Sequence, residues 1–249
     1  LDMAAYYLTT ENNTGQYYPD YAYNHLLFIP CYKIYSDSTI SEFIGQISVD
    51  DSVEFQNEWN ALKKNKDKIY ISYDSADKNC QAGDIELVEY GHAKEDKGLP
   101  VFNYSIAYDC NNREALFYED SPGSIVDVSQ LQYMLDKALV NDAVKEVRGT
   151  FEDSRQYTIR RFGVNGITVE RTVFPSDERN RSMRVYTGDA LAGKMLVAFV
   201  ALIIRNRMYT KLNDEEEKLL SSPNFMNVPA AIREFEKIEM IRQAAGLYA

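Results

Sequence analysis

Histidine and cysteine are scarce in this chain, which excludes several kinds of site. Among the 249 residues there are two histidines, His25 and His92, so neither a histidine-based zinc site nor a Ser-His-Asp triad is supported. We expect His92 to be a surface residue at a strand end, with a role as a base or a phosphate contact as the alternative. The cysteines, Cys31, Cys80 and Cys110, are odd in number and lack metal-type spacing. They are therefore predicted to be reduced cytosolic thiols.

Long apolar runs and targeting signals are also missing from the sequence. The longest apolar stretch, residues 195–204, is too short to cross a bilayer and is bounded by Lys194 and Arg205. We expect it to be a buried helix. Because no signal-peptide pattern is present, we expect a cytoplasmic protein with no membrane partner. The first residue is Leu1 rather than methionine, so we expect an upstream part to be missing.

Charge changes sign along the chain. The formal net charge is −11, with −14 in residues 1–144, +6 in residues 145–211 and −3 in residues 212–249. Residues 145–211 are called the arginine-rich segment below. Arginine suits bidentate contacts with phosphate, so this segment is a candidate DNA-binding surface; a solvated, salt-bridged surface is the alternative. The candidate DNA contacts are Arg155, Arg160, Arg161, Arg171, Arg181 and Arg184.

Helical signals mark both ends of the chain. Residues 36–39 offer N-caps for a short helix, and Asp50 opens a longer helix with apolar residues at positions 55, 59 and 62. Near the C-terminus, helices are predicted at residues 189–211, 214–221 and 229–245. The buried face of the last helix is predicted to consist of Ile232, Phe235, Ile238 and Ile241.

The middle of the chain has the pattern of strands. Predicted strands are residues 69–73, 85–90, 101–108 and 115–119. Their connections are short and contain glycine, proline or asparagine, so we expect an antiparallel meander of three to four strands. A helix capped by Asp127 should follow the meander. Further on, residues 157–159 and 167–174 should form a hairpin that is rich in arginine.

These elements predict an α+β protein in three parts. Residues 1–67 form a mostly helical N-terminal segment, residues 68–186 hold the meander and the arginine-rich hairpin, and residues 187–249 form a helical C-terminal part. A three-stranded meander followed by a helix is how an RNase H-like domain begins. The resemblance described below implies a truncated domain of that type.

Asp74 is the carboxylate of most interest, because it directly follows the predicted strand 69–73. An aspartate at the end of a buried strand is costly unless it is paired or binds a metal. Sites of phosphoryl transfer use such carboxylates to hold Mg²⁺ ions. A turn cap before Lys78 is the simpler alternative for a single aspartate.

Several ordered blocks of the sequence resemble bacterial insertion-sequence transposases of the DDE type. The most specific block is Ile71-Ser72-Tyr73-Asp74-Ser75, which is similar to a Tyr-Asp-Ser-Thr motif that contains the first catalytic aspartate of the family. The resemblance extends over nearly the whole chain. The other matching blocks are residues 78–84, 99–103, 116–119, 122–130, 149–152, 184–186, 201–207 and 228–234.

The resemblance implies an RNase H-like core, an Asp-Asp-Glu triad with two divalent metal ions, and cleavage and strand transfer of transposon DNA ends. Asp74 matches the first catalytic aspartate, so it would be both a catalytic residue and a ligand of Mg²⁺. Ala76 stands where the family has threonine. That difference is expected to weaken a hydrogen bond near the metal.

The other two triad carboxylates have no counterpart. The family places its second aspartate in a strand after the helix that follows Gln130, but here Ala138 runs straight into Leu139, a join that skips that strand. The helix with the glutamate is also missing, because residues 177–181 join directly to Ser182. The nearby Glu170 and Glu178 match non-catalytic family positions.

Three functions compete. The first is a transposase-family protein that binds DNA and has impaired or absent catalysis. The second is a non-enzymatic module that forms a homodimer, or a heterodimer with intact transposase, or that occupies transposon ends and so represses transposition. The third is an active nuclease in which Glu119, Asp127 or Glu178 replaces a lost ligand, although three convergent carboxylates need an intact scaffold.

Overall fold

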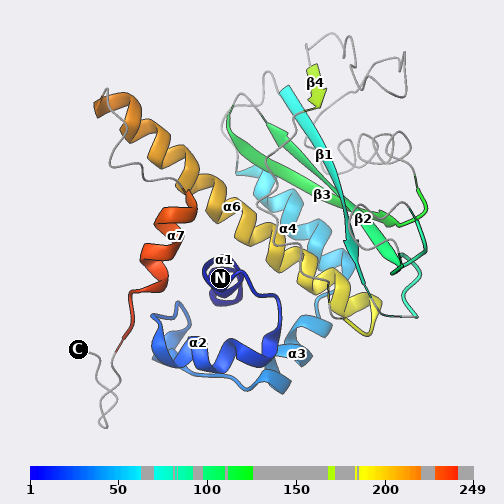
Figure 1. Cartoon of the computed structure of the whole chain (residues 1–249), viewed down its shortest axis with the longest axis horizontal. Helices are drawn as coiled ribbons and strands as arrows, with labels where there is room; N and C mark the ends of the chain where they lie inside the picture. Colours follow the sequence, from blue (N-terminus) through cyan, green and yellow to red (C-terminus); the bar gives the residue numbers. More distant parts are fainter. Residues whose placement is uncertain are drawn as a thin grey trace. The chain divides into compact units, whose positions relative to one another are not determined.

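The computed structural model divides the chain into two units (Figure 1). One unit combines Leu1–Ile47 with Asp189–Ala249 and is helical, and the other consists of Ser48–Gly188 and contains the sheet. The N- and C-terminal helical parts, which the sequence placed in separate segments, thus belong to one unit. The structure describes residues 1–62, 70–80, 82, 84–91, 98–109, 112–125, 168–171, 183, 185–219 and 228–240.

The helical unit is built from short N-terminal helices and two C-terminal ones. A Ser36 cap, whose side chain accepts a hydrogen bond from the Thr39 amide, starts α3 as the sequence predicted. The elements are α1 (Asp2–Thr10), η1 (Gly15–Tyr17), α2 (Tyr18–Asn24), η2 (Pro30–Tyr32), α3 (Asp37–Gly45), α6 (Gly188–Leu219) and α7 (Val228–Glu236). Within the described ranges, no helix has both the length and the apolar character that a membrane span requires.

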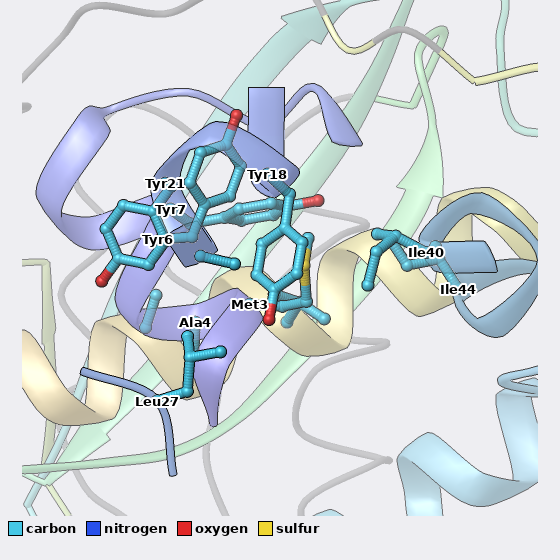
Figure 2. Packing of buried hydrophobic residues seen from close by; sticks show 12 residues of the cluster. Met3, Ala4, Tyr6, Tyr7, Tyr18, Tyr21, Leu27, Ile40 and Ile44 are labelled. Atoms are coloured by element: carbon cyan, nitrogen blue, oxygen red, sulfur yellow. The ribbon is translucent and has the colours of Figure 1, made fainter. Parts of the chain in front are cut away.

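Tyrosines from α1 and α2 form the core of the helical unit (Figure 2). The ring of Tyr6 is almost fully buried, and its centroid lies 5.7 Å from that of Tyr18 and 5.3 Å from that of Tyr21. Such tilted and edge-on contacts are favourable for aromatic rings. The aromatic residues near the N-terminus therefore serve packing.

The two C-terminal helices differ from the prediction in length and in burial. The helices expected at residues 189–211 and 214–221 are one continuous helix, α6. Ile232 of α7 is buried as expected, but Phe235 is 53% exposed and Ile238 is 61% exposed. That part of the prediction was wrong, because α7 ends at Glu236 and its buried face is limited to its first turns. Ile241 lies outside the described residues.

The sheet unit contains four described strands in the order β3-β2-β1-β4. The first three, β1 (Tyr70–Asn79), β2 (Val101–Asp109) and β3 (Glu114–Pro122), pair antiparallel with their sequence neighbours and form the predicted meander. The fourth, β4 (Thr168–Arg171), pairs parallel with β1. Helices and an antiparallel meander together give an α+β fold.

One prediction about the strands was not met. Residues 85–90 do not form a strand and make only one isolated bridge, between Glu89 and Val101. A turn takes the place of the strand, because the Val88 amide donates to the Ile85 carbonyl oxygen at 2.9 Å, and the Leu87 carbonyl oxygen accepts from the Gly123 amide at 3.1 Å. Of the predicted arginine-rich hairpin, only β4 is described; it pairs with β1. The expected helix after Asp127 and the strand at residues 157–159 lie outside the described residues.

Helix α4 (Val49–Ala61) packs against β3 with a polar face. A capping box between Ser48 and Asp51 starts the helix two residues before the predicted Asp50. The expected apolar stripe was wrong at Leu62, which is 76% exposed. The residues of α4 that are buried are Ser52, Gln56 and Asn60. The reason is hydrogen bonding to the strand, described below.

We predict that alkaline pH destabilises the helical unit through its tyrosines. The ordinary pKa of tyrosine is 10.0, and burial raises the pKa of Tyr18 to about 12. Between these values the unfolded chain loses a proton that the folded protein keeps, so the free energy of unfolding should fall as the pH rises above 10. Urea unfolding across this range should show a smaller fall for Tyr18→Phe. The control Tyr17→Phe, at a position that is 51% exposed, should behave like the parent; an identical pH dependence in all three proteins would contradict the prediction.

Candidate carboxylate site and nucleic-acid interface

Asp74 lies in the middle of β1, opposite Ile106 of β2. The prediction that it belongs to the first strand of an antiparallel meander is confirmed, but its expected position at the end of the strand was wrong. The strand continues to Asn79 because residues 75–79 pair one for one with β2. Asp74 is therefore part of a ladder and not a turn cap.

The register of β4 brings a second acidic residue close to Asp74 along the backbone. Glu170 pairs with Ser72, two residues before Asp74 on β1. Paired residues of neighbouring strands share a face of the sheet, and so do residues two apart on one strand. Asp74 and Glu170 are thus assigned to the same face on adjacent strands. Sequence comparison had placed Glu170 at a non-catalytic family position, and only the strand pairing could show this proximity.

Among the proposed replacement ligands, Glu119 does not share a face with Asp74. Glu119 of β3 pairs with Ser105, which pairs with Ser75 of β1. Because Ser75 directly follows Asp74, this row belongs to the opposite face of the sheet. Glu119 therefore does not share a face with Asp74. Asp127 and Glu178 lie outside the described residues.

A half-buried lysine lies on the face to which Asp74 belongs. Lys78 is four residues after Asp74 on β1, and its Nζ lies 5.2 Å from the centroid of the Tyr104 ring. Burial lowers the pKa of Lys78, and the charge of Asp120 on β3 opposes that shift. This face thus carries a cation in a partly apolar setting, where the cation–π contact with Tyr104 stabilises the charged form of the lysine.

The remaining metal and thiol candidates give no further site among the described residues. No group of three or more histidine, cysteine, aspartate or glutamate side chains in those ranges is placed to hold a metal ion. His25 stacks on Tyr21, with ring centroids 4.2 Å apart, and its Nδ1 lies 2.9 Å from the Tyr21 carbonyl oxygen. Cys31 and Cys80 are free thiols. His92 and Cys110 lie outside the described ranges.

The arginine-rich segment is divided between the two units. Of the six candidate DNA contacts, only Arg171 is described, and it is the last residue of β4; the other five lie outside the described residues. Arg205 and Arg207 belong to α6 of the helical unit. Burial lowers the pKa of Arg205, and the charge of Glu11 opposes that shift.

Sequence reasoning missed a buried asparagine that fixes the loop after β3. Asn103 of β2 is 9% exposed, and its Nδ2 donates to the carbonyl oxygens of Pro122 at 3.1 Å, Gly123 at 3.3 Å and Ile125 at 3.1 Å. A side-chain amide can satisfy backbone groups that no strand reaches. The available signal was an asparagine inside an otherwise apolar and aromatic strand.

No protein-family model, no curated protein and no solved structure matches this chain.

We predict that replacing the Asn103 amide destabilises the sheet unit. Asn103→Asp keeps the size of the side chain but brings acceptors instead of donors to the three carbonyl groups. Loss of a buried donor costs about 1–3 kcal/mol, so the free energy of unfolding should fall by at least that amount in urea titrations. Asn24→Asp on α2, where the amide bonds at the surface to the Asp20 carbonyl, is the matched control and should change stability little. Equal effects at the two positions would refute the assigned role.

Proposed function

We propose that this chain is a DNA-binding relative of the insertion-sequence DDE transposases whose RNase H-like core no longer cleaves DNA. The observation that carries the proposal is the strand order β3-β2-β1-β4, with β4 parallel to β1 and Asp74 on the central strand. An RNase H-like sheet also begins with three antiparallel strands and adds its next strand parallel to the first. The topology thus agrees with the sequence blocks that resemble the transposases.

The position of Asp74 supports the same proposal. In the family, the first catalytic aspartate comes from the first strand of the sheet, and here Asp74 is on β1 with strands on both sides. A residue on a central strand is held more rigidly than one on a loop, as a metal ligand requires. Asp74 would be the retained ligand for Mg²⁺, and the triad residues missing from the sequence would account for lost cleavage.

Loss of cleavage with retained binding would make the protein a competitor of intact transposase. It would occupy transposon ends or pair with an intact subunit without cutting DNA. The arginine-rich segment supplies the positive charge on an otherwise acidic chain. Phosphate contacts of this kind are independent of DNA sequence.

We predict salt-sensitive, non-specific DNA binding through the arginine-rich segment. The triple variant Arg160→Gln/Arg161→Gln/Arg181→Gln should bind every duplex tested more weakly. It makes fewer phosphate contacts, so its binding releases fewer counterions from the DNA. The slope of log K against log salt should become shallower by up to about 2.7 for three contacts. Fluorescence anisotropy over a range of salt concentrations measures both quantities.

The matched control changes three cations elsewhere. Lys218, Arg233 and Lys237 are exposed, and their replacement by glutamine makes the same change in net charge. This control should keep most of the affinity and the slope. Equal weakening by the two triple variants, or binding by the arginine variant at the parental level, would show that the segment is not the DNA-binding surface.

We also predict that the chain neither cleaves nor joins transposon ends in Mg²⁺ or Mn²⁺. The two-metal mechanism stabilises both the attacking and the leaving oxygen and needs carboxylates on both sides of the phosphate. Mg²⁺ gives up its waters reluctantly, so one retained carboxylate is a poor substitute. A supercoiled plasmid that carries element ends should stay intact with the parent protein and with Asp74→Ala alike. Cleavage by the parent above the Asp74→Ala level would instead support a rewired nuclease, with Glu170 as the first residue to test.

A further inference from the structure

The outer edge of β3 is closed by side chains of α4 rather than by another described strand. β3 is the last strand of the described sheet on this side. The Gln56 side-chain oxygen accepts a hydrogen bond from the Tyr118 amide at 3.1 Å, and the Trp59 indole Nε1 donates to the Ala115 carbonyl oxygen at 2.7 Å. An edge strand presents backbone donors and acceptors that invite another strand, and covering them with a helix prevents such pairing. Helix α4 therefore works as a cover for this edge.

The contact between α4 and the sheet contains an unfavourable group. Asn60 on the buried face of α4 is 4% exposed. Within the described part of the chain, neither its side-chain oxygen nor its side-chain nitrogen has a hydrogen-bond partner. Burying such a group without partners costs free energy that moving the helix away would recover. The cover is thus held by specific hydrogen bonds and opposed by Asn60.

The charge of β3 indicates which kind of strand could take the place of α4. The strand contains Glu114, Glu119 and Asp120 and no basic residue, and within the sheet the charge of Asp120 acts on Lys78 of β1. Directly opposed like charges destabilise a strand pair, whereas opposite charges stabilise it. A second copy of β3 would add three further carboxylates and no cation to this edge. A basic extended segment would instead meet opposite charges.

We propose that α4 is a displaceable cover and that the outer edge of β3 is a docking site for a basic, extended peptide segment of a partner protein. Displacement of α4 exposes the Tyr118 amide and the Ala115 carbonyl, and the incoming segment adds a strand to the sheet. Main-chain hydrogen bonds give affinity in this mode of recognition, and the side chains give selectivity. This interaction does not depend on the DNA-binding proposal.

The first experiment measures how readily α4 opens. Gln56→Ala/Trp59→Phe removes the two hydrogen bonds from α4 side chains to the β3 backbone, and Asn60→Leu removes the unpaired amide at similar volume. Hydrogen–deuterium exchange of residues 114–122 should be faster than in the parent for the double variant and slower for Asn60→Leu. Val49→Ala/Ala61→Gln, at exposed positions of the same helix, should match the parent.

The second experiment measures docking with a short labelled peptide of alternating lysine and valine, beside one of alternating glutamate and valine. The double variant should bind the basic peptide about tenfold more tightly than the parent, as expected from the loss of two competing hydrogen bonds. Asn60→Leu should bind it more weakly than the parent. The control Val49→Ala/Ala61→Gln should bind each peptide with the same affinity as the parent.

Three results would overturn the inference. Unchanged exchange in Asn60→Leu would show that Asn60 does not oppose the cover, and this comparison holds even if the double variant fails to fold. Equal binding of the basic and acidic peptides would remove the charge argument. Dimerisation of the double variant without peptide binding, measured by light scattering, would assign the edge to a second copy of the chain instead.

Discussion

Backbone pairing on both edges of β1 determines how the sheet unit is organised. Antiparallel pairing with β2 on one side and parallel pairing with β4 on the other fix the face to which each residue of β1 belongs. That register assigns Asp74 and Glu170 to one face and places Glu119 on the other. A shift of one residue in the pairing would exchange the two faces of β1. Any function attributed to these carboxylates therefore depends on the register.

Polar groups at the margins of the sheet are satisfied by a few specific side chains. Asn103 bonds to three carbonyl groups of the loop after β3, and Gln56 and Trp59 bond to the edge of β3. Buried polar groups need such partners because an unmade hydrogen bond costs more than a made one contributes. The same requirement explains why the buried face of α4 is polar and why Asn60 weakens its attachment.

The sequence predicted the elements that follow from local pattern. Alternation located β2 and β3 within a few residues, and an N-cap located α3. Residues 85–90 had an equally good pattern, but a turn between Ile85 and Val88 takes the place of the strand. The stripe on α7 was periodic, yet burial depends on what the rest of the fold brings to the helix, and Phe235 and Ile238 remained exposed. Local sequence contains no information on such contacts.

The candidate site was predictable only in part, for a related reason. Motif resemblance selected Asp74, whose place on the first strand is confirmed. The pairing of Glu170 with Ser72 joins residues nearly a hundred positions apart, which no local pattern reveals. Charge counting found the arginine-rich segment, and the predicted helix at residues 189–211 already contained Arg205 and Arg207, which belong to the helical unit.

The parallel pairing of β1 with β4 is the feature on which the RNase H-like proposal depends most directly. Nuclear Overhauser contacts between backbone protons of the two strands, in perdeuterated protein, measure that pairing. The account predicts contacts that link Ile71 with Val169 and Ser72 with Glu170, in the pattern of parallel strands. Absence of these contacts, together with amides at residues 168–171 that exchange as fast as in an unfolded peptide, would contradict it.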